Sequence, residues 1–166
     1  MKVINKTYKF RLFPTKEQEV LLNQHFGHSR WVYNHFLNER KEQYQKDKKS
    51  DNYYKQAATL TKLKKQEDTK WLKEVNSQTL QFTLRSLDTA FLNFCRGNAQ
   101  FPKFKSRKHK NTFTIPQFGS IDGDKINIPK FKEGIKVKLH REVKGKIGKM
   151  SITKTPTGKY YISIFT

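Results

Sequence analysis

The chain has 166 residues, a mass of 19.7 kDa and one cysteine, which excludes a large multidomain assembly and an internal disulfide framework. Its 35 Lys and Arg residues against 14 Asp and Glu residues give a formal net charge of +21, which predicts a polyanionic partner. Aromatic residues make up 13% of the chain, more than a disordered basic tail carries, so we expect it to fold. Neither a membrane-spanning run nor a signal peptide is expected, which favours an intracellular protein.

The charge and the hydrophobic pattern both change near residue 98. Residues 1–98 carry 19 basic and 10 acidic side chains, whereas residues 99–166 carry 16 and 4. Helical spacing of apolar residues before this point gives way to short alternating runs after it. The sequence therefore predicts two structural regions, of which the C-terminal one is the more basic.

The opening segment has the pattern of a half-buried strand followed by a helix. Apolar and basic residues alternate over residues 8–13, and Pro14 ends the run. Thr15 and Gln18 have the spacing of a capping box, in which each side chain accepts a hydrogen bond from an exposed amide. We therefore expect a helix to begin near Lys16.

Helical spacing continues as far as residue 95. Gly27 interrupts the first helical stretch, so two helices or one kinked helix both fit, and a further stretch opens at Tyr53 after a polar loop. The clearest helix follows a cap at Asn76 or Ser77. Its apolar stripe recurs at intervals of four, three, four and three, over Leu80, Leu84, Leu87, Phe91 and Phe94. Cys95 is expected to be a small buried hydrophobe beside this stripe.

The remaining sequence predicts a small antiparallel sheet or barrel. A basic connector over residues 103–110 separates it from the helices. The predicted strands are Thr112–Pro116, Lys125–Ile128, Ile135–Leu139, Met150–Thr153 and Tyr160–Phe165. Turn signals lie at residues 122–124 and 156–158. Because the opening strand can join this sheet, the helices over residues 15–98 become an insertion between residues 1–14 and 99–166.

No catalytic or metal-binding constellation stands out. His25, His28 and His35 could share one helical face, but neither a Cys pair nor an acidic ligand accompanies them, so we expect no metal site. Asp122 and Asp124 flank a glycine and are typical of a hairpin turn. Hydrolysis of a phosphodiester by two metals needs several converging carboxylates, and we expect neither that active site nor a cofactor in this chain.

A basic surface with interleaved aromatic residues is the strongest functional signal. Lys and Arg neutralise phosphates, and aromatic rings such as Phe101, Phe104 and Phe113 stack on bases. Polar side chains at a helix start, Ser77 and Gln81, are of the type that reads base edges. The candidate phosphate-binding residues are Lys9, Arg11, Arg30, Arg85, Lys103, Lys105, Arg107, Lys108, Lys110, Lys136, Lys138 and Arg141.

These patterns coincide with a known family. The segments that carry the resemblance are Lys6–Thr15, Phe26-Gly27, Arg30–Asn34, Trp71-Leu72, Gln81–Phe94, Phe101–Ser106, Phe113–Gln117, Ile128–Lys130, Val137–His140 and Gly158–Tyr161. In this order they resemble the TnpB/OrfB family of transposon-encoded RNA-guided DNA endonucleases, over essentially the whole chain.

The resemblance implies an α+β fold: an OB-like β-barrel, the wedge domain, split by an inserted helical recognition domain. It implies binding of a guide RNA scaffold and of the guide–target heteroduplex, and reading of a short motif beside the target in double-stranded DNA. The residues that it assigns to motif reading are Tyr53, Ser77, Gln78, Gln81, Phe113, Thr114 and Gln117.

Family nucleases continue into a RuvC-like domain with three catalytic carboxylates, where the divalent metal binds, and this sequence stops before it. We therefore expect a portion without catalysis of its own, in the bacterial cytoplasm and at the nucleoid when bound to DNA. Three alternatives stay open: half of a split nuclease that needs a separate RuvC polypeptide, an RNA-independent helix-turn-helix regulator formed near Phe26–Leu37, and a remnant that binds any nucleic acid.

Overall fold

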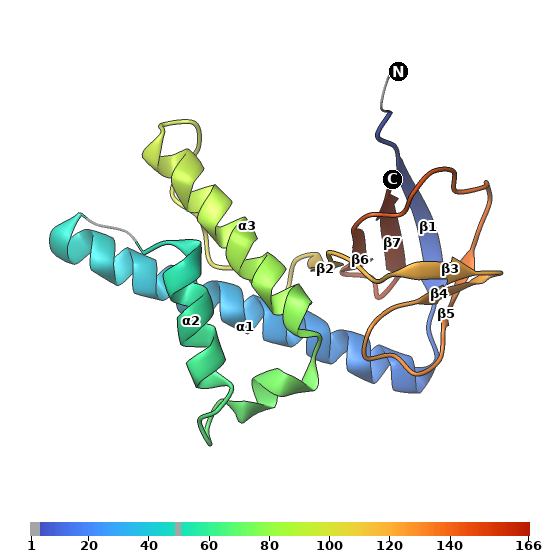
Figure 1. Ribbon diagram of the computed structural model, residues 1–166, viewed down its shortest axis with the longest axis horizontal. Coiled ribbons are helices and arrows are strands. Elements are labelled where there is room, and N and C mark those ends of the chain that lie inside the picture. Colours follow the sequence, from blue (N-terminus) through green and yellow to red (C-terminus); the bar gives the residue numbers. More distant parts are fainter. Residues whose placement is uncertain (1–3, 49–50) are drawn as a thin grey trace. The chain divides into compact units, whose positions relative to one another are not determined.

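The computed structural model describes residues 4–48 and 51–166 and has an α+β fold (Figure 1). The chain divides into two compact units. The sheet unit comprises the chain up to Phe26 together with Arg107–Thr166, and the helical unit comprises Gly27–Ser106. In sequence, the helical unit thus falls between the two segments of the sheet unit. These compact units divide at 26/27 and 106/107. The domain limits at 14/15 and 98/99 stay a prediction.

The sheet unit is built on one antiparallel sheet of seven strands, in the order β2-β6-β7-β1-β5-β4-β3. The strands are β1 (Thr7–Phe13), β2 (Asn111–Ile115), β3 (Ser120–Asp122), β4 (Lys125–Asn127), β5 (Ile135–Lys138), β6 (Met150–Lys154) and β7 (Tyr160–Phe165). The opening strand does join the strands that follow the helices, as the alternation predicts. The pairings leave β2 and β3 as the two edges, so the sheet is open in the described residues.

Strict alternation creates the core of the sheet unit. In β1 the buried residues are Tyr8, Phe10 and Leu12, while their neighbours are exposed. Side chains from the inner faces of β1, β2, β4, β5, β6 and β7 form one hydrophobic cluster. The first half of α1 (Lys16–Asp47) adds Leu22 and Phe26 to the same cluster. The opposite, outer face of the sheet is therefore free to carry polar side chains.

Local signals at the strand and helix ends behave as the sequence predicts. The Thr15 amide donates to Gln18 Oε1 at 3.0 Å and the Gln18 amide donates to Thr15 Oγ1 at 3.2 Å, so the capping box is confirmed. Gly123 and Gly158 have φ values of +61° and +86°, the conformation that the predicted turns require. Strand β3 was not predicted, because three residues are too few to show an alternating pattern.

The helical unit contains the remainder of α1, α2 (Tyr53–Leu63), a 3₁₀ helix, η1 (Lys70–Glu74), and α3 (Ser77–Cys95). Helix α1 runs through Gly27 without interruption, so the structure selects one helix where the sequence left two possibilities. Asn76 is the cap of α3. The apolar stripe of α3 is buried as far as Phe91 and half-buried at Phe94, but Cys95 is exposed, which corrects its predicted burial. The last turn of α3 carries it beyond the packed part of the helix.

A buried arginine joins the three helices of this unit. Arg40 of α1 is fully buried; its Nε donates to Gln56 Oε1 of α2 at 2.8 Å and its Nη2 donates to Asp88 Oδ1 of α3 at 2.9 Å. Gln56 also donates to the Phe36 carbonyl at 3.0 Å. The ring of Phe91 lies beneath the guanidinium, 5.4 Å from its central carbon. These contacts compensate for the charge that burial removes from water.

Candidate nucleic-acid interface

The outer face of β1 and its neighbours gathers the basic residues of the sheet unit. The alternation of β1 places Lys9, Arg11 and Phe13 on this face. Arg11 lies opposite Tyr161 of β7 and opposite Lys138 of β5. Residues that are directly opposite in an antiparallel pair share one face of the sheet. The register therefore brings residues from three distant parts of the sequence into one row.

This face carries like charges in direct cross-strand register. Arg11 is opposite Lys138, and Lys136 of β5 is opposite Lys125 of β4. Like charges directly opposite each other destabilise a sheet. None of the four forms an ion pair with a carboxylate in the described part of the chain. An arrangement that costs stability and lacks internal neutralisation is typical of a surface that binds an anion.

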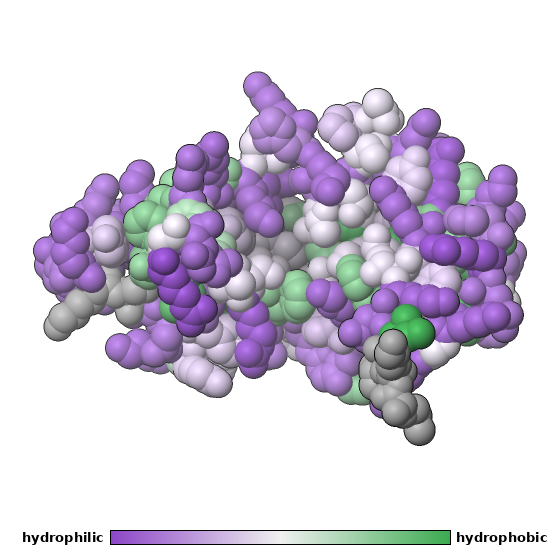
Figure 2. Space-filling view, turned by 90° about the horizontal axis from the view of Figure 1, so that it is seen from above, coloured by the Kyte–Doolittle hydropathy of each residue, from purple (hydrophilic) through white to green (hydrophobic). Residues whose placement is uncertain are grey.

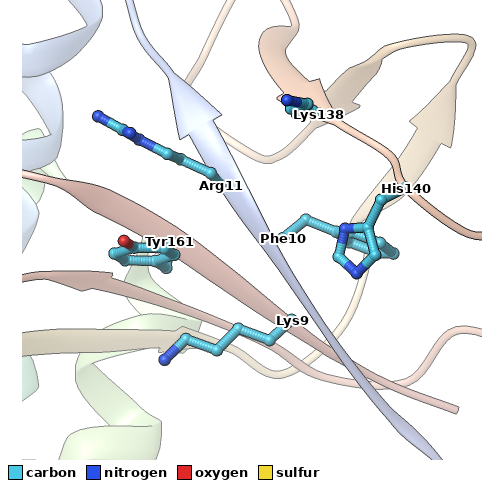
Figure 3. A pocket seen from close by; sticks show the side chains of 6 residues that line it. All are labelled: Lys9, Phe10, Arg11, Lys138, His140 and Tyr161. Carbon is cyan, nitrogen blue, oxygen red and sulfur yellow. The ribbon is translucent and has the colours of Figure 1, made fainter.

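A pocket of about 430 Å³ opens on this face (Figure 3). Lys9, Phe10 and Arg11 of β1 line it together with Tyr161 of β7, Lys138 of β5 and His140 just after β5. Figure 3 shows Lys9, Arg11 and Tyr161 to one side of β1, and Lys138 and His140 to the other side. The Lys9 amine lies 4.9 Å from the centre of the Tyr161 ring, and the His140 ring packs edge-on against Phe10.

The same sheet face becomes rich in hydroxyl groups towards β2. Thr112 of β2 pairs with Thr153 of β6, and their hydroxyls are 3.2 Å apart. Thr114 pairs with Ser151, with the hydroxyls 2.8 Å apart. Thr153 lies in turn opposite Tyr161. One row therefore runs from hydroxyl groups through an aromatic ring to two cations.

The residues assigned to motif reading fall in both units. In the sheet unit, Phe113 is 2% exposed and its ring packs against His25 and Phe26 in the core. Thr114 is held by its bond to Ser151, whereas Gln117 is exposed after β2. The Phe113 ring is thus part of the hydrophobic core in this structure, and the exposed polar groups near it belong to its neighbours.

In the helical unit the assigned residues lie at helix N-termini. Tyr53 begins α2, and the central carbon of the Arg85 guanidinium, from α3, is 4.1 Å from the centre of its ring. Ser77 and Gln81 are exposed and lie four residues apart in α3, so they share a helix face. Gln78 is half-buried, and its Oε1 has no hydrogen-bond partner in the structure.

Lys105 of the basic connector is anchored to α1 by two hydrogen bonds. The Asn34 side chain donates to the Lys105 carbonyl at 2.9 Å and accepts from the Lys105 amide at 2.8 Å. The Lys105 amine lies 4.4 Å from the centre of the Tyr33 ring, and desolvation of this amine lowers the pKa of Lys105, although the residue as a whole is exposed. Burial raises the pKa of Tyr33. The members of the connector assigned to phosphate binding are all exposed: Lys103, Lys105, Arg107, Lys108 and Lys110.

Two further predicted phosphate-binding residues, Arg141 and Arg30, lie outside the connector. Arg141 Nη2 donates to the Thr7 carbonyl at 3.3 Å, and its guanidinium lies over the Tyr8 ring at 4.6 Å. Arg30 is half-buried in α1. Sequence reasoning missed Lys125, Tyr161 and His140, because only the strand register shows that they join Arg11 and Lys138.

The three histidines of α1 that were considered as metal ligands contact backbone carbonyls and an aromatic ring. The three side chains of His25, His28 and His35 contact the Leu21 carbonyl, the Trp71 carbonyl and the Trp31 ring, respectively. Within residues 4–48 and 51–166, no group of three or more His, Cys, Asp or Glu residues could hold a metal ion. No helix in those ranges is long and apolar enough to cross a membrane.

Comparison with known proteins identifies the family. The model of the OrfB/IS605 helix-turn-helix domain matches residues 1–49. InsQ of Escherichia coli (strain K12), named as an RNA-guided DNA endonuclease, is 34% identical over 97% of this chain and 40% of its own length. The chain belongs to the TnpB/OrfB family. A Streptomyces pristinaespiralis protein, also named as an RNA-guided DNA endonuclease, is 30% identical over 99% of the chain and 42% of its own length.

This TnpB/OrfB chain thus spans about two fifths of the length of these two relatives. It is also 37% identical to the virulence protein VsdF of Salmonella dublin, over 61% of this chain and 92% of VsdF. In the described part of the matched helix-turn-helix segment, the structure has β1 followed by one continuous helix, with no turn between two helices.

Proposed function

We propose that this chain is the RNA- and DNA-binding portion of a TnpB-like nuclease. It binds the guide RNA scaffold and the guide–target heteroduplex, largely through phosphates. The observation that carries the proposal is the outer face of β7, β1, β5 and β4, where like-charged residues pair in register without carboxylate partners among the described residues. The names of the two long relatives, which describe RNA-guided DNA endonucleases, support it.

The proposal assigns the sheet unit to an OB-like wedge and the helical unit to a recognition domain. Two observations support this assignment: one core serves the whole antiparallel sheet, and the helical unit is inserted in sequence. The side chains proposed to read the target-adjacent motif are Tyr53, Ser77, Gln78, Gln81, Thr114 and Gln117, with Phe113 supporting the last two from the core. The exposed positions of Ser77, Gln81 and Gln117 fit contacts with base edges.

The proposal places cleavage outside residues 1–166. In the family, a RuvC-like domain supplies the carboxylates and binds the divalent metal, so a separate RuvC polypeptide is the partner expected if the two parts act as a split nuclease. The working location is the bacterial cytoplasm, at the nucleoid when DNA is bound. Cleavage that appears only after addition of the RuvC part, in the presence of guide RNA, would support this division.

One observation favours a second candidate, a regulator that binds DNA without RNA: the matching family model carries the description helix-turn-helix. Such a motif places a second helix in the major groove after a tight turn. Residues Phe26–Leu37 lie within the continuous helix α1, which is a different geometry. Tight, sequence-specific duplex binding by RNA-free protein would favour this candidate over the proposed one.

The proposed function is tested by purifying the full chain from cells that carry its genomic neighbourhood and sequencing the RNA that accompanies it. We expect one discrete structured RNA that is retained at moderate salt. Reversing Lys103 and Lys110 to Glu should weaken its retention, whereas reversing Lys62 and Lys65, on α2 and the turn after it, is the control matched in charge. A mixture of unrelated RNA that washes away with salt would contradict the proposal.

A further inference from the structure

The pocket on the outer face of the sheet unit combines two chemistries that a simple phosphate-binding surface does not need together. Its walls hold three cations, Lys9, Arg11 and Lys138, and one half-buried tyrosine ring, that of Tyr161 (Figure 3). Its volume of about 430 Å³ is within the range of about 300–1,000 Å³ that small-molecule sites occupy. Figure 2 shows that hydrophilic side chains cover much of the face of the molecule seen in that view.

We propose that this pocket holds one unpaired nucleotide of a nucleic-acid strand. The base stacks on Tyr161, and the adjoining phosphate binds Arg11 and Lys138. The inference rests on the proposed function and names the ligand of one part of that interface. It assigns binding roles to Tyr161 and His140, which lie in segments that carry the family resemblance but received no role from it.

The geometry favours an unpaired nucleotide over a duplex. In a duplex, both faces of each base are covered by neighbouring bases, so only an unpaired base can place its face on a protein ring. The Lys9 amine lies over the Tyr161 ring, 4.9 Å from its centre, so a stacked base takes the place of this flexible side chain on the ring. Arg11 and Thr153 lie on either side of Tyr161 in register and hold its position.

The charges define where the phosphate binds. Arg11 and Lys138 are opposite each other in the register of β1 and β5, their side chains extend to the two sides of β1 (Figure 3), and neither has a carboxylate partner in the described residues. A phosphate between them relieves their mutual repulsion and accepts hydrogen bonds from both. His140 closes the far side of the pocket against Phe10. Inorganic phosphate alone would use the cations but would not use Tyr161, so the ring distinguishes a nucleotide from a free anion.

The test compares two fluorescein-labelled RNA hairpins that share one stem closed by a non-nucleotide linker, of which one is blunt and the other has a four-nucleotide unpaired extension. Fluorescence anisotropy gives the affinity of the full chain for each. We expect the wild type to bind the extended hairpin about tenfold more tightly, as stacking of one base implies. Tyr161→Ala should remove this gain and change the affinity for the blunt hairpin less than twofold, whereas Tyr161→Phe should keep the gain.

Two controls keep the result interpretable. Tyr54→Ala removes an exposed tyrosine of the helical unit and should leave the gain intact. Far-UV circular dichroism checks that both Tyr161 variants fold. Equal losses for the two hairpins, or no loss in Tyr161→Ala, would overturn the inference. A DNA extension that gives the same Tyr161-dependent gain would support it and extend the ligand to both sugars.

The two proposals fail in different ways. If the wild type binds both hairpins equally tightly with a strong salt dependence, the pocket inference is wrong and the proposed function stands. If it binds neither hairpin at moderate salt, the proposed function is wrong as well. Excess inorganic phosphate should compete equally for wild type and Tyr161→Ala. Selective competition with the wild type would contradict the assignment of the base, rather than the phosphate, to Tyr161.

Discussion

The two units of this molecule treat positive charge in opposite ways. In the helical unit, Arg40 is fully buried, forms an ion pair with Asp88 and donates a hydrogen bond to Gln56. In the sheet unit, Arg11 and Lys138 lie on the outer face, opposite each other and without a carboxylate partner in the described residues. Removal of a cation should therefore cost stability in the first case and nucleic-acid binding in the second.

The largest effect is expected inside the sheet unit, at a residue that sequence reasoning assigned to DNA contacts. Because the Phe113 ring is buried against His25 and Phe26, Phe113→Ala should lower the free energy of unfolding by about 3–5 kcal/mol. Thr112→Ala, at the exposed neighbouring position, should cost less than about 1 kcal/mol. Urea unfolding followed by circular dichroism measures both. If both variants lost less than about 1 kcal/mol, Phe113 would not be a core residue, and its assignment to DNA contacts would be restored.

The buried arginine gives the next largest effect. Arg40→Met should lower the free energy of unfolding by about 3 kcal/mol, because it leaves Asp88 and Gln56 without their partner. Arg85→Met is the matched control: this arginine is exposed above Tyr53 and should cost less than about 1 kcal/mol. If the two variants were equally stable, the contrast between buried and exposed cations would fail.

The anchor of the connector should have a smaller effect. Asn34→Ala removes both hydrogen bonds to the Lys105 backbone and should cost about 1–2 kcal/mol of stability. Because the connector then loses its attachment to α1, RNA affinity should fall as well. Asn38→Ala, one turn along α1 and exposed, is the control for both measurements. An unchanged RNA affinity in a destabilised Asn34 variant would show that the anchor serves the fold alone.

The smallest effect concerns pH. Desolvation raises the pKa of Glu39 above its ordinary value, so this carboxyl favours folding most below its unfolded-state pKa, and its contribution declines as pH rises through the folded-state pKa. Glu39→Gln should therefore be more stable than the wild type at pH 7, with a smaller difference at pH 4. Thermal unfolding at the two pH values measures the difference. A larger difference at pH 4 would contradict the direction of the shift.

Local patterns predicted much of the fold. The alternation of β1, the Thr15–Gln18 capping box and the apolar stripe of α3 each depend on residues close in sequence, and all are confirmed. The continuity of α1 through Gly27 could not be predicted, because residues on both sides of the glycine pack in different units. Cys95 was placed wrongly, since the apolar pattern does not show where packing on α3 ends.

The candidate site was harder to predict than the fold. Lys9, Arg11 and Lys138 were found as basic residues, but their meeting with Tyr161 depends on strand register across the inserted helices. Composition also does not show whether an aromatic residue of a strand lies on the inner or the outer face of the sheet. Phe113 and Tyr161 are both aromatic residues of strands, yet one is in the core and the other lines the pocket.

The central claim is that the cations of the outer sheet face bind nucleic-acid phosphates. The most direct measurement is the salt dependence of RNA affinity for the wild type and for the triple variant Lys9→Ala, Arg11→Ala, Lys138→Ala. Each lost phosphate contact reduces the magnitude of the slope of log affinity against log salt by about 0.7–0.9, so we predict a reduction of about 2.1–2.7 in the triple variant. An unchanged slope, with the fold intact, would contradict the account.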